Sequence, residues 1–287
     1  MKFWHALPFM QPSDAIALAE ASDESDYDGI TIPDHLFYPR NLRSPYPYSD
    51  DGRPGFTEDS PWPDPWVLIG GMAARTTRIH FTTNVYIAPA RDLFTVAKAV
   101  STAAVLSEGR VTLGVGAGWM QEEFEQTGQD FESRGRRLNE MIGVLRKLWT
   151  GDWVAHHGEH YDFDEVKISP VPSDPIPVFV GGHSAAALRR AALYGDGWIG
   201  VDYKVEEAEQ ILEKLRHSLT RAKREDEPFE VILALWAHID ADLCQRFADL
   251  GVTGFLCAPW MFVKETDIQS RVDAVKRFGD EIIAKVR

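Results

Sequence analysis

Residues 78–116, RIHFTTNVYIAPARDLFTVAKAVSTAAVLSEGRVTLGVG, contain the pattern on which the fold prediction rests. Two strand-like apolar runs, 78–88 and 110–116, are separated by a segment with helical spacing. A strand, a helix and a second strand in this order are typical of two parallel strands joined by a crossover helix. The unit recurs along the chain. Several of its strand-like runs are apolar at consecutive positions, as in strands that are covered on both faces of a parallel sheet.

Working outward from this unit gives eight strand-like runs that alternate with helical segments. Residues 134–150, for example, place Met141, Val144 and Leu148 on one face of a helix. Eight such units in about 290 residues are what a TIM (β/α)8 barrel needs, so we predict an α/β barrel that forms one domain over residues 1–287. An open doubly wound sheet uses the same alternation and is the competing architecture. The strand-like runs are 2–7, 29–33, 78–88, 110–116, 176–181, 197–201, 229–238 and 253–258.

Composition and charge narrow the class of protein. The chain has 287 residues, of which 44 are acidic and 30 are basic, and its formal net charge is −14 at pH 7. This balance argues against nucleic acid as a partner, because phosphate binding needs clustered Lys and Arg. Cys244 and Cys257 lie in apolar segments and predict a reducing compartment without disulfides. Because no apolar run approaches ~18 residues and the N-terminus has no signal-peptide pattern, we expect a cytoplasmic protein without a membrane partner.

Loop lengths point to one end of the predicted barrel. In such a barrel the active site lies at the carboxyl ends of the strands, on the loops that lead into the helices. Residues 33–64 form a long segment of this kind, rich in Pro, Tyr, Trp and Arg, and we expect a lid or binding loop there. Residues 117–133 form a second one, whereas 151–175 follow a helix and belong to the opposite end. The aromatic residues that either line a pocket or pack the lid down are Tyr46, Tyr48, Trp62 and Trp66.

The run LGVGAGW at 113–119 is similar to a dinucleotide-binding fingerprint, but it fails the test. Trp119 stands where that pattern needs a third glycine. Two interpretations remain open. The small residues Gly114, Gly116 and Gly118 either relieve crowding at a narrow barrel mouth, or they let a flat ring lie against bare backbone.

Asp34 and His35 directly follow the second strand-like run, at the end of the barrel where catalysis is expected. Histidine suits proton transfer, or a hydrogen bond to a ring carbonyl. A structural histidine is the competing interpretation, although a place at a strand end favours function. His5, His183 and His238 also fall in or just after strand-like runs. We expect these polar rings to point into the same mouth, because core packing does not favour them.

Gly181-Gly182-His183-Ser184 ends the fifth strand-like run and opens a helical segment. Backbone N–H groups and the positive end of a helix dipole favour an anion there, with the Ser184 hydroxyl as a further donor. A glycine turn followed by an N-cap serine is the simpler interpretation. No metal is expected. His156, His157 and His160 have metal-like spacing, but they fall outside the predicted mouth and lack a completing cysteine or carboxylate pattern.

Several blocks in register resemble the luciferase-like flavin and deazaflavin oxidoreductases. They are PARDLFTVAKAVSTAAVLSEGRVTLGVGAGW at 89–119, EEFEQTGQDFESRGRRLNEMIGVLRKLWTG at 122–151 and PIPVFVGGHSAAALRRAALYGDGWIG at 175–200. The resemblance implies a TIM barrel that holds a tricyclic ring at its mouth, with the phosphate of that cofactor at residues 181–184. It also implies a cis peptide bond between Asn84 and Val85, behind the ring.

Within that family, the Asp34–His35 pair and the GVGAGW block are most similar to the branch that uses coenzyme F420, a 5-deazaflavin. The resemblance implies an oxidoreductase that transfers a hydride between F420 and a small organic substrate. An FMN-dependent two-component monooxygenase is the alternative, and a non-catalytic flavin- or deazaflavin-binding protein is a further one. Some members carry Glu where this sequence has Trp119, so His35 is the predicted proton donor, with Glu122 and Glu123 as alternates.

The implied site gathers residues from several segments. F420 carries an acidic tail, which arginines of 33–64 are expected to meet; they are Arg40, Arg43 and Arg53. The predicted catalytic residues are His35, Asp34 and Glu122. The predicted cofactor-binding residues are Asp34, His35, Asn84, Val85, Gly114, Gly116, Gly118, Trp119, Gly181, Gly182, His183 and Ser184. Related barrels pair through their second and third helices, and a small-residue surface there predicts that a homodimer can form; its residues are Ala97, Ala99, Ala103 and Ala104.

Overall fold

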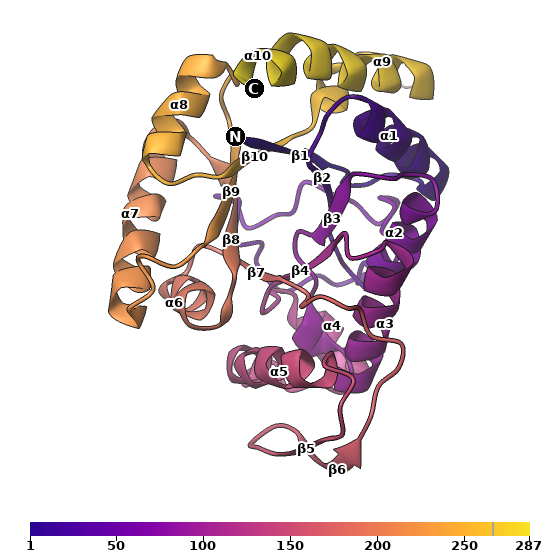
Figure 1. Cartoon of the computed structure of the whole chain (residues 1–287), viewed down its shortest axis with the longest axis vertical. Coiled ribbons are helices and arrows are strands. Elements are labelled where there is room, and N and C mark those ends of the chain that lie inside the picture. The colour runs from indigo at the N-terminus through magenta and orange to yellow at the C-terminus, as the bar shows by residue number, and fades with distance from the viewer. Residues whose placement is uncertain (266) are drawn as a thin grey trace.

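The computed structural model describes residues 1–265 and 267–287. Within them, eight parallel strands close into a barrel in the order β1-β10-β9-β8-β7-β4-β3-β2 (Figure 1). β1 pairs with both β2 and β10, so the sheet has no edge. The predicted barrel is therefore confirmed, and the open sheet is wrong. The barrel strands are β1 Lys2–Ala6, β2 Gly29–Ile32, β3 His80–Thr83, β4 Val111–Val115, β7 Val178–Gly181, β8 Gly197–Tyr203, β9 Glu230–Leu235 and β10 Gly254–Cys257.

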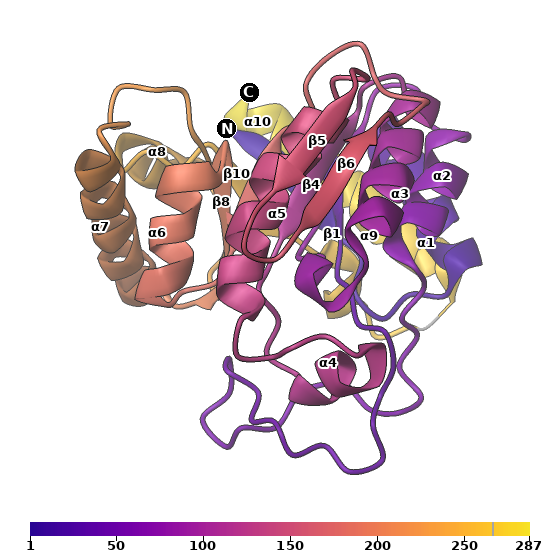
Figure 2. The same cartoon turned by 90° about the horizontal axis from the view of Figure 1, so that it is seen from below.

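Helices surround the barrel, and two smaller features interrupt the alternation. The helix α4 (Gln121–Thr127) lies after β4, next to the segment 33–64 at one end of the barrel (Figure 2). The hairpin of β5 (Val154–His157) and β6 (Asp162–Val166) follows α5. The outer helices are α1 Pro12–Glu24, α2 Pro65–Ala73, α3 Leu93–Leu106, α5 Arg134–Leu148, α6 Ala185–Tyr194, α7 Val205–Ala222, α8 Ala241–Asp249 and α9 Ile268–Phe278. Short turns are η1 Ala88–Ala90, η2 Pro259–Phe262, η3 Gly279–Ile283 and α10 Ala284–Val286.

The strands bury both faces, as their apolar runs predict. Side chains alternate along a strand, so one set points into the barrel and the other toward the helices. The inward set forms its own cluster, namely Trp4, Phe179, Ile199, Ile232 and Leu256. The outward set packs under the helices, with residues such as Phe3, Phe81 and Phe255 fully buried. The barrel interior is thus filled by side chains, and any ligand site must lie at its end.

Helix starts follow the sequence signals in one case and depart from them in another. Asp64 caps α2 with Pro65 at the first helical position, because its carboxylate accepts hydrogen bonds from the N–H groups of Trp66 and Val67, each at 3.0 Å. At α1, however, Ser13 and Asp14 do not cap the helix. The N-cap is Gln11, which makes no side-chain capping bond, and Pro12 takes the first position.

The structure shortens the third predicted strand. The run 78–88 is a strand only over β3. After Thr83 the chain leaves the sheet through a cis peptide bond between Asn84 and Val85, which confirms the implied geometry.

The β5–β6 hairpin lies against the outside of α5 and α3 (Figure 2). His156 Nε2 lies 3.0 Å from a Glu140 carboxylate oxygen, and Phe163 packs edge-on against Phe94.

The predicted small-residue surface for pairing is wrong. Ala97, Ala103 and Ala104 are buried in the core, and only Ala99 of the four is half-buried at the surface of α3. The outward face of α2 and α3 instead exposes larger apolar side chains, such as Val67 at 76% and Leu106 at 62%. Pairing through these two helices stays a prediction. None of the helices in the described part of the chain combines the length and the apolar character that crossing a bilayer requires.

Candidate functional site

Glycines at the carboxyl end of the barrel make room for the Val85 side chain and for the Thr83 carbonyl group. A Cβ atom on Gly116 would lie 2.4 Å from Val85 Cγ2, and one on Gly181 would lie 2.5 Å from Val85 Cγ1. Both distances are far shorter than van der Waals contact, so larger residues do not fit at either position. A Cβ on Gly114 would lie 1.8 Å from the Thr83 carbonyl oxygen. Strands β3, β4 and β7 therefore bring predicted site residues from three segments into contact.

Asp34, predicted to be catalytic, is held in a buried ion pair. Its two carboxylate oxygens accept hydrogen bonds from Arg91 Nη1 and Nη2, both at 2.7 Å, and one of them also accepts the Ile87 N–H at 2.9 Å. Burial raises the pKa of Asp34, and the Arg91 guanidinium opposes that shift. Burial alone would lower the pKa of Arg91, but the Asp34 charge outweighs it and raises that pKa. The pair ties the end of β2 to the segment after β3.

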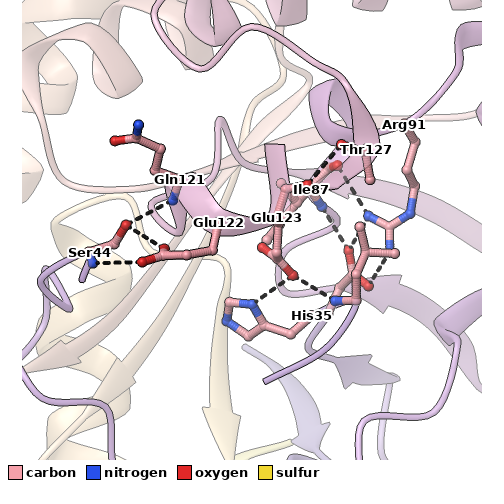
Figure 3. Close-up of polar contacts among 10 residues, drawn as sticks. His35, Ser44, Ile87, Arg91, Gln121, Glu122, Glu123 and Thr127 are labelled. Carbon is pink, nitrogen blue, oxygen red and sulfur yellow. Dashed lines mark hydrogen bonds and ion pairs between the residues drawn. The ribbon is translucent and has the colours of Figure 1, made fainter. Parts of the chain in front are cut away.

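His35 is oriented by Glu123 (Figure 3). Its Nδ1 lies 3.2 Å from Glu123 Oε1, which also accepts the Leu36 N–H at 2.6 Å. The Glu123 side chain is fully buried, and the His35 side chain is 7% exposed. Where the Glu123 carboxylate is ionised it only accepts hydrogen bonds, and Nδ1 is then the protonated ring nitrogen. Nε2 makes no hydrogen bond with the described residues and is left for another partner.

Glu122, the neighbouring carboxylate, faces a different partner (Figure 3). Its oxygens accept the Arg43 N–H at 2.6 Å and the Ser44 hydroxyl at 2.7 Å. Burial raises the pKa of Glu122, but the N–H groups of Arg43 and Ser44 and the Ser44 hydroxyl outweigh that and lower it. Glu122 and Glu123 together therefore fasten two points of the segment 33–64 to α4.

Aromatic rings of the segment 33–64, together with Trp119 after β4, pack around His35. The centroid of its ring lies 4.7 Å from that of Trp62, 5.2 Å from Phe56 and 5.5 Å from Trp119. The packing extends on both sides, with Phe9 after β1 contacting Trp62 and Tyr48 contacting His183 after β7. The segment thus spans the carboxyl end of the barrel. Trp66 differs, because it lies in α2 and packs against Tyr86 in the core.

The turn between β7 and α6 has the geometry of a helix start. Ser184 is the N-cap of α6, and its Oγ accepts the Ala187 N–H at 3.2 Å. Gly182 has φ +107°, a backbone conformation that other residues rarely adopt. His183 and Ser184 are exposed. The N-cap interpretation is confirmed, and it leaves the first N–H groups of a ten-residue helix facing solvent.

Several expected site residues lie elsewhere. His5 points outward to α1, where its Nδ1 lies 2.7 Å from the Ser22 Oγ. His238 is exposed beyond the end of β9. The expectation that these rings point into the mouth is wrong for His5, because side chains alternate along β1 and Trp4 takes the inward place. Arg43, expected to meet the cofactor tail, pairs with Glu125 at 2.5 Å.

The sequence patterns do not predict Arg91 as the partner of Asp34, or Phe56 as a neighbour of His35. They give Glu123 only as an alternate proton donor. A signal for Arg91 was present: it follows the third strand, as Asp34 follows the second, and adjacent parallel strands end side by side. No comparable signal marks Phe56, since its contact with His35 depends on how a segment of more than twenty residues folds back.

Proteins with known descriptions are similar to this chain in sequence or in fold. The chain is 30% identical over 236 residues to the F420-dependent glucose-6-phosphate dehydrogenase of Nakamurella multipartita, with 80% of this chain and 65% of that one covered. A solved F420-dependent secondary alcohol dehydrogenase in complex with an F420–acetone adduct has a TM-score of 0.77 at 18% identity, covering 100% of this chain and 99% of that one. The 3,6-diketocamphane monooxygenase of Pseudomonas putida in complex with FMN has a TM-score of 0.63 at 17% identity, covering 86% and 71%.

Residues 2–250 match the family described as luciferase-like monooxygenase. The match covers well over half of the chain, and it includes the strand ends, the glycine-lined mouth and the β7–α6 turn described above. The resemblance that the sequence blocks indicate is thereby confirmed. This chain belongs to the luciferase-like monooxygenase family.

Proposed function

We propose that this chain is an oxidoreductase that binds coenzyme F420 at the carboxyl end of its barrel and transfers a hydride between F420 and a small organic substrate. The observation that carries the proposal is the pairing of His35 with Glu123 beside glycine-lined backbone. The F420-dependent dehydrogenase at 30% identity supports the choice of cofactor. When bound, a deazaflavin ring supplies a carbon that accepts or donates a hydride.

The residues at the barrel mouth fit a flat cofactor with an anionic side chain. Gly116 and Gly181 make room for the Val85 side chain. In the proposal, Val85 is the surface against which a flat ring lies. In the proposal, Asn84, Val85, Gly118 and Trp119 complete this cradle. The cofactor phosphate binds at the turn of Gly181, Gly182, His183 and Ser184, whose exposed helix N–H groups favour an anion.

His35 is the proposed proton carrier. A hydride that joins or leaves a substrate carbon is accompanied by a proton at a neighbouring atom of that substrate. Nε2 of His35 is the ring nitrogen that has no partner among the described residues. Glu123 holds the ring by its other nitrogen, so it is a positioning residue. The rings of Phe56, Trp62 and Trp119 enclose His35 and exclude water from it.

Asp34 and Glu122 act structurally in this proposal, although the sequence pattern placed them among the catalytic residues. All their hydrogen bonds go to protein groups: Arg91 and Ile87 for Asp34, and Arg43 and Ser44 for Glu122. We propose that the segment 33–64 serves as a lid, which Glu122 and Glu123 hold over the mouth at two points. The aromatic contact between Tyr48 and His183 reaches the phosphate turn.

An FMN-dependent two-component monooxygenase is the second candidate. The structural likeness to a Pseudomonas monooxygenase that was solved in complex with FMN favours it. This candidate predicts oxygen consumption when a separate reductase supplies reduced FMN. A protein that binds either cofactor without turnover is the third, and the buried His35–Glu123 contact argues against it, since a carrier does not need an oriented histidine.

Cofactor titration tests the proposal. The purified chain is mixed with F420 and, separately, with FMN, and binding is followed by cofactor fluorescence. We expect micromolar dissociation constants for F420 and at least tenfold weaker binding of FMN. The His35→Asn variant serves as a control for folding and keeps the F420 affinity within a few-fold. Micromolar binding of FMN without binding of F420 would overturn the proposal.

A further inference from the structure

Strands that lie across the barrel from each other bring further side chains to its mouth. In the order β1-β10-β9-β8-β7-β4-β3-β2, β9 is four places from β3, and β8 is four places from β2. Because the barrel is closed and has eight strands, these pairs form opposite walls (Figure 1). The end of β9 therefore faces Val85, which follows β3, and the end of β8 faces His35, which follows β2. The walls at β8 and β9 have no role in the function proposed above.

The floor of the mouth on this side is apolar and made of small side chains. Ala6, Val201 and Ala234 lie near the ends of β1, β8 and β9, and they are half-buried against the inner cluster. Trp236 follows Ala234 by two residues, and its N–H donates to the Tyr203 carbonyl at 2.9 Å, so the pairing with β8 continues to this point. Alternation along the strand then turns Trp236 toward the barrel axis, yet it is 68% exposed. Its ring is a free wall beside an apolar floor.

Asp202 lies at the rim of this floor, in an irregular part of β8. From Gly200 to Tyr203, β8 advances three residues while its partner β9 advances two, which is a β-bulge. Asp202 lies within the bulge and has φ +63°, a left-handed conformation that Asp and Asn tolerate better than most residues. The residue is exposed, and its carboxylate forms no hydrogen bond or ion pair with the described residues. Bulges next to active sites often change the direction of a side chain in this way.

Two tyrosines of the segment 33–64 lie near Asp202. The ring centroids of Tyr46 and Tyr48 are 5.5 Å apart, and Tyr48 also contacts His183, which follows β7, the strand beside β8. Burial raises the pKa of Tyr46 and that of Tyr48 to about 12, and the Asp202 charge adds to both shifts. The carboxylate is therefore close enough to act on both hydroxyl groups. A carboxylate beside aromatic rings that has no cation as a partner is complementary to an ammonium group.

We propose that Asp202 selects a small organic cation as the substrate. Asp202 binds the ammonium group, the hydrocarbon body packs on Trp236, and the reacting end lies near His35. This proposal rests on the proposed function, because a flat cofactor that lies on Val85 turns its other face toward Trp236, where the substrate must then bind. Since His35 and Asp202 lie on opposite walls, Asp202 holds the substrate at a point away from the proton carrier. The net charge of −14 favours the approach of a cation over that of an anion.

Three probes of similar shape and different charge test this proposal. At neutral pH benzylamine is a cation, benzyl alcohol is neutral and benzoate is an anion. Their dissociation constants are measured by ligand-observed NMR, first with the chain alone and then with F420 added. We expect benzylamine to bind about fivefold more tightly than benzyl alcohol at low ionic strength, and benzoate to bind most weakly. Asp202→Asn keeps the size of the side chain and tolerates the left-handed backbone, and it should bind benzylamine and benzyl alcohol equally.

A matched control makes the same chemical change elsewhere. Asp226→Asn removes a charge from an exposed turn between α7 and β9, at the other end of the barrel, and should keep the fivefold preference. Trp236→Ala should weaken the binding of benzylamine and benzyl alcohol by similar factors, because both lose the same apolar contact. Unchanged binding of both probes in this variant would show that Trp236 is not the wall and would overturn the proposed substrate position.

The outcomes separate this proposal from the choice of cofactor. Equal binding of benzylamine and benzyl alcohol by the native chain, no binding of any probe, or a preserved preference in Asp202→Asn overturns the proposal and leaves F420 as the proposed cofactor. If F420 itself does not bind, the proposed function fails. The measurements on the chain alone then still decide whether the mouth selects a cation: a preference that Asp202→Asn abolishes supports it, and any other result overturns it.

Discussion

His5 and His35 lie at the carboxyl ends of neighbouring strands, yet they occupy opposite sides of the barrel wall. His5 points outward and packs between β1 and α1, where burial lowers its pKa to about 3. Ser22 donates its hydroxyl proton to the Leu18 carbonyl, so it accepts the proton of His5 Nδ1. The Nε2 atom of His5 is buried, and no described residue forms a hydrogen bond with it. His35 lies beyond the strand end, held by a carboxylate.

The difference shows that a strand end does not by itself make a histidine functional. Both rings have one nitrogen engaged, but the environment of the second nitrogen differs. For His5 it is apolar and closed, which keeps the ring neutral. For His35 it is enclosed by aromatic residues of a segment that only tertiary packing brings there. Variants at the two histidines, and at the glutamates that hold the segment, sharpen this comparison.

The largest expected effect is on turnover in His35→Asn. Asparagine can still donate a hydrogen bond to Glu123, but it lacks the second ring nitrogen, so the proton carrier is lost. We expect kcat to fall about 10²–10⁴-fold, with Tm nearly unchanged. The measurement is cofactor absorbance with a substrate found by screening. His238→Asn, at an exposed histidine without a proposed role, should behave as the native chain. Native turnover in His35→Asn would remove His35 from the mechanism.

The next effect concerns stability and pH at His5. The pKa is near 3 in the folded chain and about 6.5 in the unfolded one, so the unfolded state binds an extra proton between these values. The stability contributed by neutral His5 is complete above pH 6.5 and decreases as pH falls toward 3, by up to about 1.4 kcal/mol per pH unit.

The variant His5→Asn tests this linkage without relying on its absolute stability. Asparagine can donate to Ser22 as Nδ1 does, and it does not titrate. Urea unfolding at pH 7, 6, 5 and 4 should show a shallower loss of unfolding free energy than in the native chain. The His35→Asn variant, measured in parallel, controls for histidine removal in general. Identical pH slopes in native and His5→Asn chains would show that His5 is not buried neutral.

A smaller effect is expected for Glu123→Gln. Glutamine still accepts the Leu36 N–H, but it no longer presents a full negative charge to His35 Nδ1. We expect kcat to fall about tenfold while the dissociation constant for the cofactor stays within twofold, since Glu123 positions the ring without touching the cofactor. A merely structural role would change both quantities together, or neither.

The smallest effect is expected at the second anchor of the segment 33–64. Glu122→Gln weakens the bonds to the Arg43 N–H and the Ser44 hydroxyl, so the segment should open more often. Trypsin cleavage after Arg40, followed by mass spectrometry, should become a few-fold faster. Glu125→Gln removes an exposed pair with Arg43 and serves as the control, because exposed pairs contribute little. Equal cleavage rates in both variants would contradict an anchoring role for Glu122.

Much of the site could be predicted from the strand order, because a barrel brings all strand ends to one place. The glycines of β4 and the Ser184 cap belong to this class, whereas the cis bond at Asn84–Val85 is implied only by the resemblance to the family. The partners of the charged residues could not be predicted in the same way. Asp34 contacts Arg91, and His35 contacts Glu123, although more than fifty residues of sequence separate the members of each pair. Local sequence patterns do not predict contacts between residues so far apart in the chain.

The sequence alone determined the barrel and the end at which its site lies, because the apolar periodicity repeats eight times and the long loops follow the strands. Only the tertiary structure decided which histidine faces the mouth and which carboxylate holds it. The physical reason is that a one-residue step along a strand reverses the direction of a side chain, as it does between Trp4 and His5. Contacts between distant loops depend in turn on how the whole barrel sets their relative positions.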